Sequence, residues 1–211
     1  LEPFRQAFAR LKAFVEELRA QGIAIRTLDL GGGLGIPYGE DEPPLPDDYA
    51  EIAKRETAGL GCQLIFEPGR MLVGNAGILV TRVLYVKKSG ARYFVIVDGA
   101  MNDLIRPTLY EAYHAIVPVR ETGGSPQPLD VVGPVCETGD IFAEQRNLPL
   151  PKAGDLLVLR SAGAYGASMS STYNARPLIA EVMVNGGKSA VVRPRQTYDE
   201  LLARDSLPEW L

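Results

Sequence analysis

The sequence predicts an α/β domain followed by an all-β domain. Up to about residue 70, segments with helical periodicity alternate with short apolar runs, an order typical of parallel α/β units. From about residue 76, short strand-like runs follow one another with turn residues between them, which favours an antiparallel β-barrel or sandwich. We therefore predict one domain over residues 1–75 and a second over residues 76–211.

Four elements are predicted in the first domain. Residues 1–18 should form an amphipathic helix, and residues 23–30, which end at three glycines, should form a buried strand. Residues 46–60 follow as a helix that opens with proline and acidic residues, and residues 62–70 as a strand that runs into a turn. Because the first helix is already formed at residue 1, we expect the chain to be the C-terminal portion of a longer polypeptide.

The second domain should contain two hairpins and a closing helix. Ser89-Gly90 lies between two apolar runs, and Asn185-Gly186 lies between two later ones. Such pairs supply the positive backbone angles that tight hairpin turns require. Residues 197–205 have the pattern of a short final helix.

Composition excludes several classes of protein. The net charge of −4 and the pI near 5.2 argue against nucleic acid or an anionic membrane as the main partner. Two cysteines are too few for a disulfide scaffold, so a cytoplasmic location is expected. No apolar run approaches the length of a membrane span. The single histidine, His114, excludes a histidine-cluster metal site, and no metal is expected.

Two motifs at the ends of the predicted strands suggest an anion site. "DLGGGLG" at 29–35 leaves backbone N–H groups unshielded, so that a phosphate could approach them, although a tight turn would explain the glycines equally well. The segment lacks the glycine at position 36 that a dinucleotide fingerprint requires. Arg70 in "FEPGR" can bind a phosphate or a carboxylate, or it can be an ordinary surface arginine.

Two later loops also carry polar and aromatic residues. Arg106 and Tyr110 would share one face of a helix, where they suit an anionic small molecule, although a solvated helix face is the commoner explanation. In "GAYGASMSSTYNARP" at 163–177, the scarcity of packing side chains indicates that something approaches the backbone, and Tyr173 offers a phenol. His114 is expected to be an ordinary, partly buried histidine, and Cys62 to belong to the core.

The segment "GPVCETGD" at 133–140 places a thiol beside a carboxylate. A structural cysteine usually lies within an apolar run, whereas Cys136 lies in a turn-like segment next to Glu137. Taken by itself, the segment fits a reactive cysteine and an idle loop cysteine about equally well.

Taken together, four segments resemble the diaminopimelate decarboxylase family, and the resemblance covers essentially the whole chain. In chain order they are "LDLGGGLG", "FEPGR", "GPVCETGD" and "GAYGASMSSTYNARP". The resemblance implies a pyridoxal-phosphate enzyme of the alanine-racemase-like fold, in which a (β/α)8 barrel precedes a β domain. Residues 1–75 would be the last strands and helices of the cofactor-binding barrel, and residues 76–211 the β domain. The implied activity is decarboxylation of meso-2,6-diaminopimelate to L-lysine and CO2, the last step of lysine biosynthesis.

The resemblance also implies roles for individual residues. The cofactor-binding residues would be Gly33, Glu67, Pro68, Gly69, Arg70 and Tyr173, and the substrate-binding residues would be Arg70, Arg106, Tyr110, Glu137 and Tyr173. Cys136 matches the family's proton donor, which reaches the active site of the partner subunit in a homodimer. A thiol is a reasonable proton donor near neutral pH. Glu137 suits the distal ammonium of the substrate, and Arg70 and Arg106 suit its distal carboxylate.

Two features leave alternatives open. In the family, the cofactor is attached to a lysine in a segment that nothing in this sequence matches. The lysines present lie elsewhere: Lys12, Lys54, Lys87, Lys88, Lys152 and Lys188. This 211-residue piece alone is therefore expected to be inactive. The same fold serves ornithine, arginine and carboxynorspermidine decarboxylases, although "CET" with Arg106 and Tyr110 favours a substrate with a distal carboxylate. A non-catalytic paralogue is the remaining alternative, against which the retention of Cys136 and Glu137 argues.

Overall fold

The computed structural model describes residues 1–121 and 123–210. The chain forms two compact units, Leu1–Gly77 and Ile78–Leu211, which are described separately. No helix in the described residues is long and apolar enough to cross a membrane.

The first unit alternates helices and strands, as the sequence predicts. Its elements are α1 (Glu2–Ala20), β1 (Thr27–Asp29), α2 (Pro46–Glu56), β2 (Gln63–Ile65), α3 (Gly69–Val73) and the 3-10 turn η1 (Gly74–Ala76). β1 and β2 are parallel neighbours, with Leu28 opposite Leu64, which confirms the predicted pairing. Both strands are shorter than predicted, because only three residues of each apolar run pair with the neighbouring strand. α2 ends at Glu56, before the predicted residue 60.

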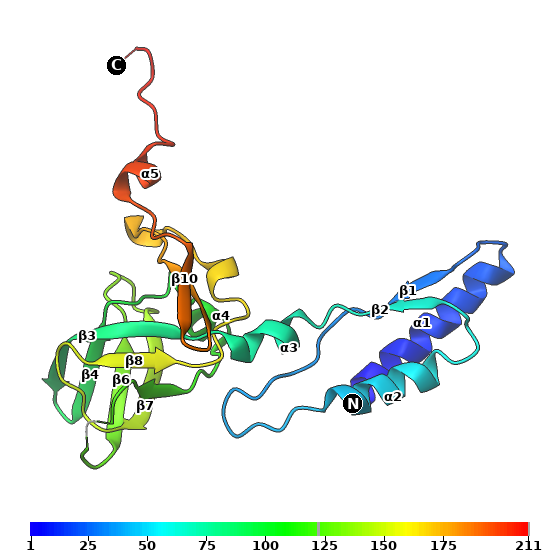
Figure 1. The fold of residues 1–211 in the computed structure, drawn as a ribbon, viewed down its shortest axis with the longest axis horizontal. Helices are drawn as coiled ribbons and strands as arrows, with labels where there is room; N and C mark the ends of the chain where they lie inside the picture. The colour runs from blue at the N-terminus through cyan, green and yellow to red at the C-terminus, as the bar shows by residue number, and fades with distance from the viewer. Residues whose placement is uncertain (122, 211) are drawn as a thin grey trace. The chain divides into compact units, whose positions relative to one another are not determined.

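The two longer helices pack on the same strand pair (Figure 1). The rings of Phe4 and Phe8 in α1 meet the ring of Tyr49 in α2 edge-on, with centroids 5.0 and 5.6 Å apart. The buried core of this unit consists of Phe8, Val15, Leu28, Leu30, Leu34, Tyr49, Ile52, Ala53 and Leu60. Cys62 lies beside this core and is half-buried, so the prediction of a core cysteine is correct only in part.

The second unit is built on a six-stranded mixed sheet in the order β5-β8-β3-β4-β6-β7 (Figure 1). The strands are β3 (Leu79–Ser89), β4 (Arg92–Val97), β5 (Ile116–Pro118), β6 (Gln127–Val132), β7 (Ile141–Leu148) and β8 (Leu156–Leu159). Every pairing in this sheet is antiparallel except that of β4 with β6. The predicted antiparallel domain therefore needs one correction. A long connection that contains α4 (Arg106–Tyr110) and β5 brings the chain back in the direction of β4.

Both predicted hairpins are present. Ser89 lies opposite Arg92, and Gly90 occupies the first loop position with a φ of 60°, which primed hairpin turns require. The strands β9 (Glu181–Asn185) and β10 (Lys188–Arg193) form a separate antiparallel pair. The final helix α5 (Tyr198–Leu202) begins with a capping box between Thr197 and Glu200, and it is shorter than the predicted 197–205.

One apolar core fills the interior of the second unit. Its buried members are Leu79, Val83, Val95, Val97, Leu104, Ile116, Leu129, Val131, Phe142, Ala143, Leu148, Leu157 and Leu159. They come from all six strands of the sheet and from the loop before α4. The segments that carry the candidate site residues of this unit leave the sheet at its strand ends.

Candidate active site

The predicted anion-binding residues of the first unit lie in the segments that follow β1 and β2, with Gly69 and Arg70 at the start of α3. The N–H of Glu67 donates to the carbonyl of Gly31 at 2.8 Å, and the N–H of Gly31 donates to the carboxylate of Asp29 at 2.8 Å. A Cβ at Gly32 would collide with the carbonyl oxygen of Glu67. The middle glycine is therefore required by the close approach of the two segments, a reason that the sequence alone did not indicate.

Gly33 and Arg70 provide the part of these segments that fits an anion. Gly33 is exposed, and its φ of 88° turns the backbone in a way that side chains rarely permit. The guanidinium of Arg70 reaches the Gly33 carbonyl at 3.5 Å, so that a positive charge lies beside the open glycine backbone. An unshielded backbone next to a guanidinium is a donor set that suits a phosphate.

The segment 133–140 is the connection between β6 and β7, and Asp140 holds it closed. The carboxylate of Asp140 accepts the N–H of Val135 at 2.8 Å, and the N–H of Gly133 donates to the Asp140 carbonyl at 2.9 Å. A Cβ at Gly133 would collide with that carboxylate. Burial raises the pKa of Asp140, while its bonds from backbone N–H groups act in the opposite direction.

Two further bonds hold this connection against the α4 region. The N–H of Met101 donates to the Asp140 carboxylate at 2.7 Å, and the hydroxyl of Thr108 in α4 donates to the Gly139 carbonyl at 2.7 Å. The helix that carries Arg106 and Tyr110 is thereby tied to the loop that carries Cys136 and Glu137.

Cys136, Glu137 and Tyr173 are exposed in this unit. The phenol of Tyr173 donates to a Glu137 carboxylate oxygen at 3.4 Å, a long hydrogen bond that nevertheless brings the two side chains together. The structure thus places the Tyr173 phenol beside Glu137, which follows Cys136 in the chain.

The loop that carries Tyr173 contains the two 3-10 turns η2 (Ala167–Met169) and η3 (Tyr173–Ala175). Arg176 fixes its far end by donating to the Asn102 side chain at 2.8 Å and to the Asp98 carbonyl at 2.6 Å. The amide of Asn102 in turn donates to the Ser171 carbonyl at 3.1 Å. These anchors explain the small residues of the segment in part, because the loop is held by backbone and polar contacts rather than by apolar packing.

Arg106 and Tyr110 both lie in α4, but their side chains differ in burial. Tyr110 is 61% exposed, whereas Arg106 is only 8% exposed. The guanidinium of Arg106 lies 3.0 Å from Nε2 of His114 and 5.9 Å from the ring centre of Tyr165. The predicted shared face is therefore wrong in detail, because Arg106 turns into the domain while Tyr110 faces outward.

His114 is fully buried, not partly buried as the sequence suggested. Its Nδ1 lies 2.9 Å from the carbonyl of Arg160, which can only accept a hydrogen bond. Burial lowers the pKa of His114, and the charges of Arg106 and Arg146 lower it further, although the bond to Arg160 acts in the opposite direction. The imidazole is therefore neutral near pH 7, with its proton on Nδ1.

This protonation state is directly measurable, because His114 is the single histidine of the chain. In NMR spectra of the protein with 15N-labelled histidine, we expect a single imidazole whose Nδ1 is protonated and whose Nε2 is unprotonated. Its titration midpoint should lie below the ordinary value of about 6.5. Since the unfolded chain would bind this proton more readily, His114 should reduce the stability of the fold as the pH falls below about 6.5. A midpoint at or above the ordinary value would contradict the assignment.

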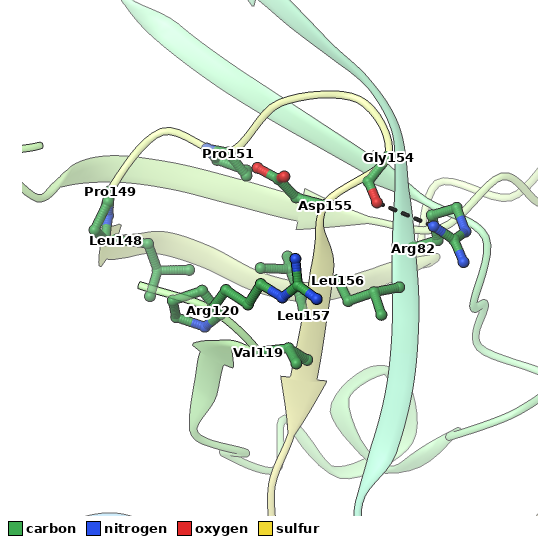
Figure 2. Close-up of a pocket in the computed structure, with 11 residues that line it drawn as sticks. Arg82, Val119, Arg120, Leu148, Pro149, Pro151, Gly154, Asp155, Leu156 and Leu157 are labelled. Atoms are coloured by element: carbon green, nitrogen blue, oxygen red, sulfur yellow. Dashed lines mark hydrogen bonds between the residues drawn. The ribbon is translucent and has the colours of Figure 1, made fainter. Parts of the chain in front are cut away.

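One pocket of the second unit, with a volume of about 320 Å³, lies around β8. Figure 2 shows residues that line it, among them Arg120 and Arg82, and the Arg82 guanidinium donates to the Gly154 carbonyl at 3.0 Å. None of the predicted site residues lines it. A smaller hollow of about 270 Å³ is bordered by Tyr173 and Asn102. In the ranges 1–121 and 123–210, no cluster of three or more His, Cys, Asp or Glu side chains is placed to hold a metal.

Comparison with known proteins identifies the class to which this fold and these loops belong. Residues 19–163 match the family model for the pyridoxal-dependent decarboxylase C-terminal sheet domain, and the chain belongs to this family. Its relatives include diaminopimelate decarboxylases. The chain is 53% identical to the diaminopimelate decarboxylase of Zymomonas mobilis over 100% of its length and 51% identical to that of Pseudomonas aeruginosa over 98%.

Solved structures agree with the sequence relatives. Diaminopimelate decarboxylase from M. jannaschii in co-complex with L-lysine matches 100% of the chain with a TM-score of 0.94 and 36% identity. The enzyme from Helicobacter pylori complexed with L-lysine matches 96% with a TM-score of 0.90 and 41% identity. In every case the chain spans about half of the relative's length: 50% of both sequences and 50% of both structures.

Proposed function

We propose that the complete polypeptide containing this chain decarboxylates meso-2,6-diaminopimelate to L-lysine and CO2, and that this chain supplies its C-terminal half. The observation that carries the proposal is the 3.4 Å contact of the Tyr173 phenol with Glu137, the neighbour of Cys136, in a chain about 50% identical to diaminopimelate decarboxylases. Arg106 lies in the helix that Thr108 ties to the loop of Cys136 and Glu137.

The proposed cofactor is pyridoxal phosphate, in keeping with the family description. Gly33, Glu67, Pro68, Gly69 and Arg70 would hold its phosphate side, since Arg70 lies beside the exposed Gly33 backbone. Tyr173 would complete the binding site. When bound, the cofactor withdraws the electrons that the departing CO2 leaves behind. The protein then has to orient the reacting bond, exclude water and return a proton to the α-carbon.

Cys136 is the proposed proton donor. Its exposed position in the β6–β7 connection suits a thiol that acts on a site outside its own domain. In the proposed homodimer, each subunit would present Cys136 to the active site of the other. The proposed location is the cytoplasm, which the low cysteine count favours.

The distal end of the substrate carries both an ammonium and a carboxylate. Because the product is L-lysine, the carboxylate that leaves belongs to the D centre, and the L centre is the distal end. Glu137 would bind its ammonium, and Arg70, Arg106 and Tyr110 would bind its carboxylate. This division of charges separates diaminopimelate from ornithine or arginine, which have no distal carboxylate.

Substrate profiling of the complete polypeptide tests the proposal. With pyridoxal phosphate present, we expect CO2 release from meso-diaminopimelate and far slower release from ornithine, arginine and carboxynorspermidine. Turnover of one of these compounds without turnover of meso-diaminopimelate would assign the chain to another substrate. Cofactor binding without turnover of any of them would favour a non-catalytic paralogue.

A further inference from the structure

We propose that His114 is a positioning residue that holds the guanidinium of Arg106 in the orientation that binds the distal carboxylate of the substrate. The inference rests on the proposed function and adds a residue to it. The Nε2 atom of His114 lies 3.0 Å from Nη1 of Arg106, and both side chains are buried, at 0% and 8% exposure.

The direction of the hydrogen bond follows from the second partner of the imidazole. The Arg160 carbonyl, 2.9 Å from Nδ1, can only accept, so Nδ1 carries the proton. A neutral imidazole has only one N–H, so Nε2 must accept from Arg106. A charged imidazole would instead turn an N–H toward the guanidinium, near the additional charge of Arg146. The contact therefore requires a neutral histidine.

The backbone explains how the two residues meet although they are eight positions apart. α4 ends at Tyr110, and the capping residue Glu111 is left-handed, with a φ of 52° and a ψ of 29°. The N–H of Ala112 then donates to the Arg106 carbonyl at 3.3 Å. This reversal directs the following residues back along the helix. His114 consequently packs against the side chain at which α4 begins.

An acceptor at this place has a specific effect on an arginine. The guanidinium is a planar fork of five N–H donors, and it binds a carboxylate best when its plane is aligned with the two oxygens. A bond from Nη1 to a fixed acceptor restricts rotation of that plane. His114 is itself held by the carbonyl of Arg160, which directly follows β8. The orientation of the Arg106 guanidinium is therefore fixed relative to the end of this strand.

Two near-isosteric replacements separate this role from a general packing role. In His114→Gln, the side-chain oxygen takes the place of Nε2 and can still accept from Arg106. In His114→Asn, the amide takes the place of Nδ1 and can still donate to Arg160, but the acceptor for Arg106 is gone. Each variant therefore loses one of the two bonds of the imidazole, so their costs in stability should be similar.

The experiment measures kcat and KM for meso-diaminopimelate and inhibition by L-lysine and cadaverine, using the complete polypeptide. L-lysine retains the distal carboxylate, and cadaverine lacks it. We expect His114→Asn to raise KM and the L-lysine inhibition constant about 10- to 100-fold, the loss typical of a hydrogen bond to a charged group. Its kcat and cadaverine inhibition should change little, and His114→Gln should stay within about threefold of wild type in all four values.

The outcomes distinguish the inference from the proposed function. Equal losses in the Asn and Gln variants, or losses that affect cadaverine as much as L-lysine, would overturn the positioning role alone. A wild-type polypeptide that does not turn over meso-diaminopimelate would overturn the proposed function and this inference with it. In an Arg106→Ala background the difference between Asn and Gln should vanish, because the residue that His114 positions is no longer present.

Discussion

Replacing Cys136 with alanine in the complete polypeptide should lower kcat by about 10²–10⁴-fold, the usual loss when a positioned proton donor is removed. The absorbance of the bound cofactor should stay close to that of the wild type, because the thiol acts only after CO2 has left. Folding should also be unaffected, since Cys136 is exposed and the connection is held by Asp140. Single-turnover kinetics would place the loss in the protonation step.

Cys62→Ala is the matched control. It removes the second free thiol of the chain, a half-buried one in the first unit that accepts a contact from Arg19 at 3.1 Å. That change should alter stability somewhat and kcat very little. Near-normal turnover by Cys136→Ala would make Cys136 an idle loop cysteine and would leave the proton donor to be found elsewhere.

Arg106→Ala should lower kcat/KM for meso-diaminopimelate by roughly 30- to several-thousand-fold. The estimate follows from the cost of removing one partner of a desolvated charge pair, about 2–5 kcal/mol. Most of the loss should fall on KM, because the residue is proposed to bind the distal carboxylate rather than the reacting bond.

Inhibition by two small ligands shows whether that loss concerns the substrate. L-lysine and cadaverine differ by one carboxylate, so Arg106→Ala should weaken inhibition by L-lysine much more than inhibition by cadaverine. The alanine variant also removes the contact between Arg106 and the buried Nε2 of His114, so the thermal midpoint of the variant has to be measured alongside. If both ligands were weakened equally, Arg106 would be structural, and diaminopimelate would lose one of its supports over ornithine and arginine.

Local patterns were sufficient to predict most of the fold. The hairpin at Gly90 and the helix at Thr197 depend on residues next to one another in sequence, and both are present. The parallel pairing of β4 with β6 was not predictable in this way, because it depends on where a long connection ends. Strand lengths were overestimated in the first unit because an apolar run does not show how many of its residues meet a neighbouring strand.

The sequence singled out the exposed candidate residues more readily than the groups that hold them. Cys136, Glu137 and Tyr173 belong to contiguous motifs, whereas Asp140, Asn102 and Arg176 act through contacts with other segments. The aspartate of "GPVCETGD" was visible, but its bond to Met101 was not. His114 was misjudged for the same reason, since the left-handed residue that returns it to Arg106 is a glutamate, which gives no turn signal.

The closed base of the 133–140 connection has a consequence for how such proteins can diversify. Gly133 and Asp140 are constrained by each other, and Val135 is buried, so changes at these positions would disturb the frame of the loop. Residues 136–138 are exposed at its tip. The connection therefore has a fixed base, and substitutions at Glu137 and Thr138 can change the specificity while Cys136 is kept and the surrounding sheet stays intact.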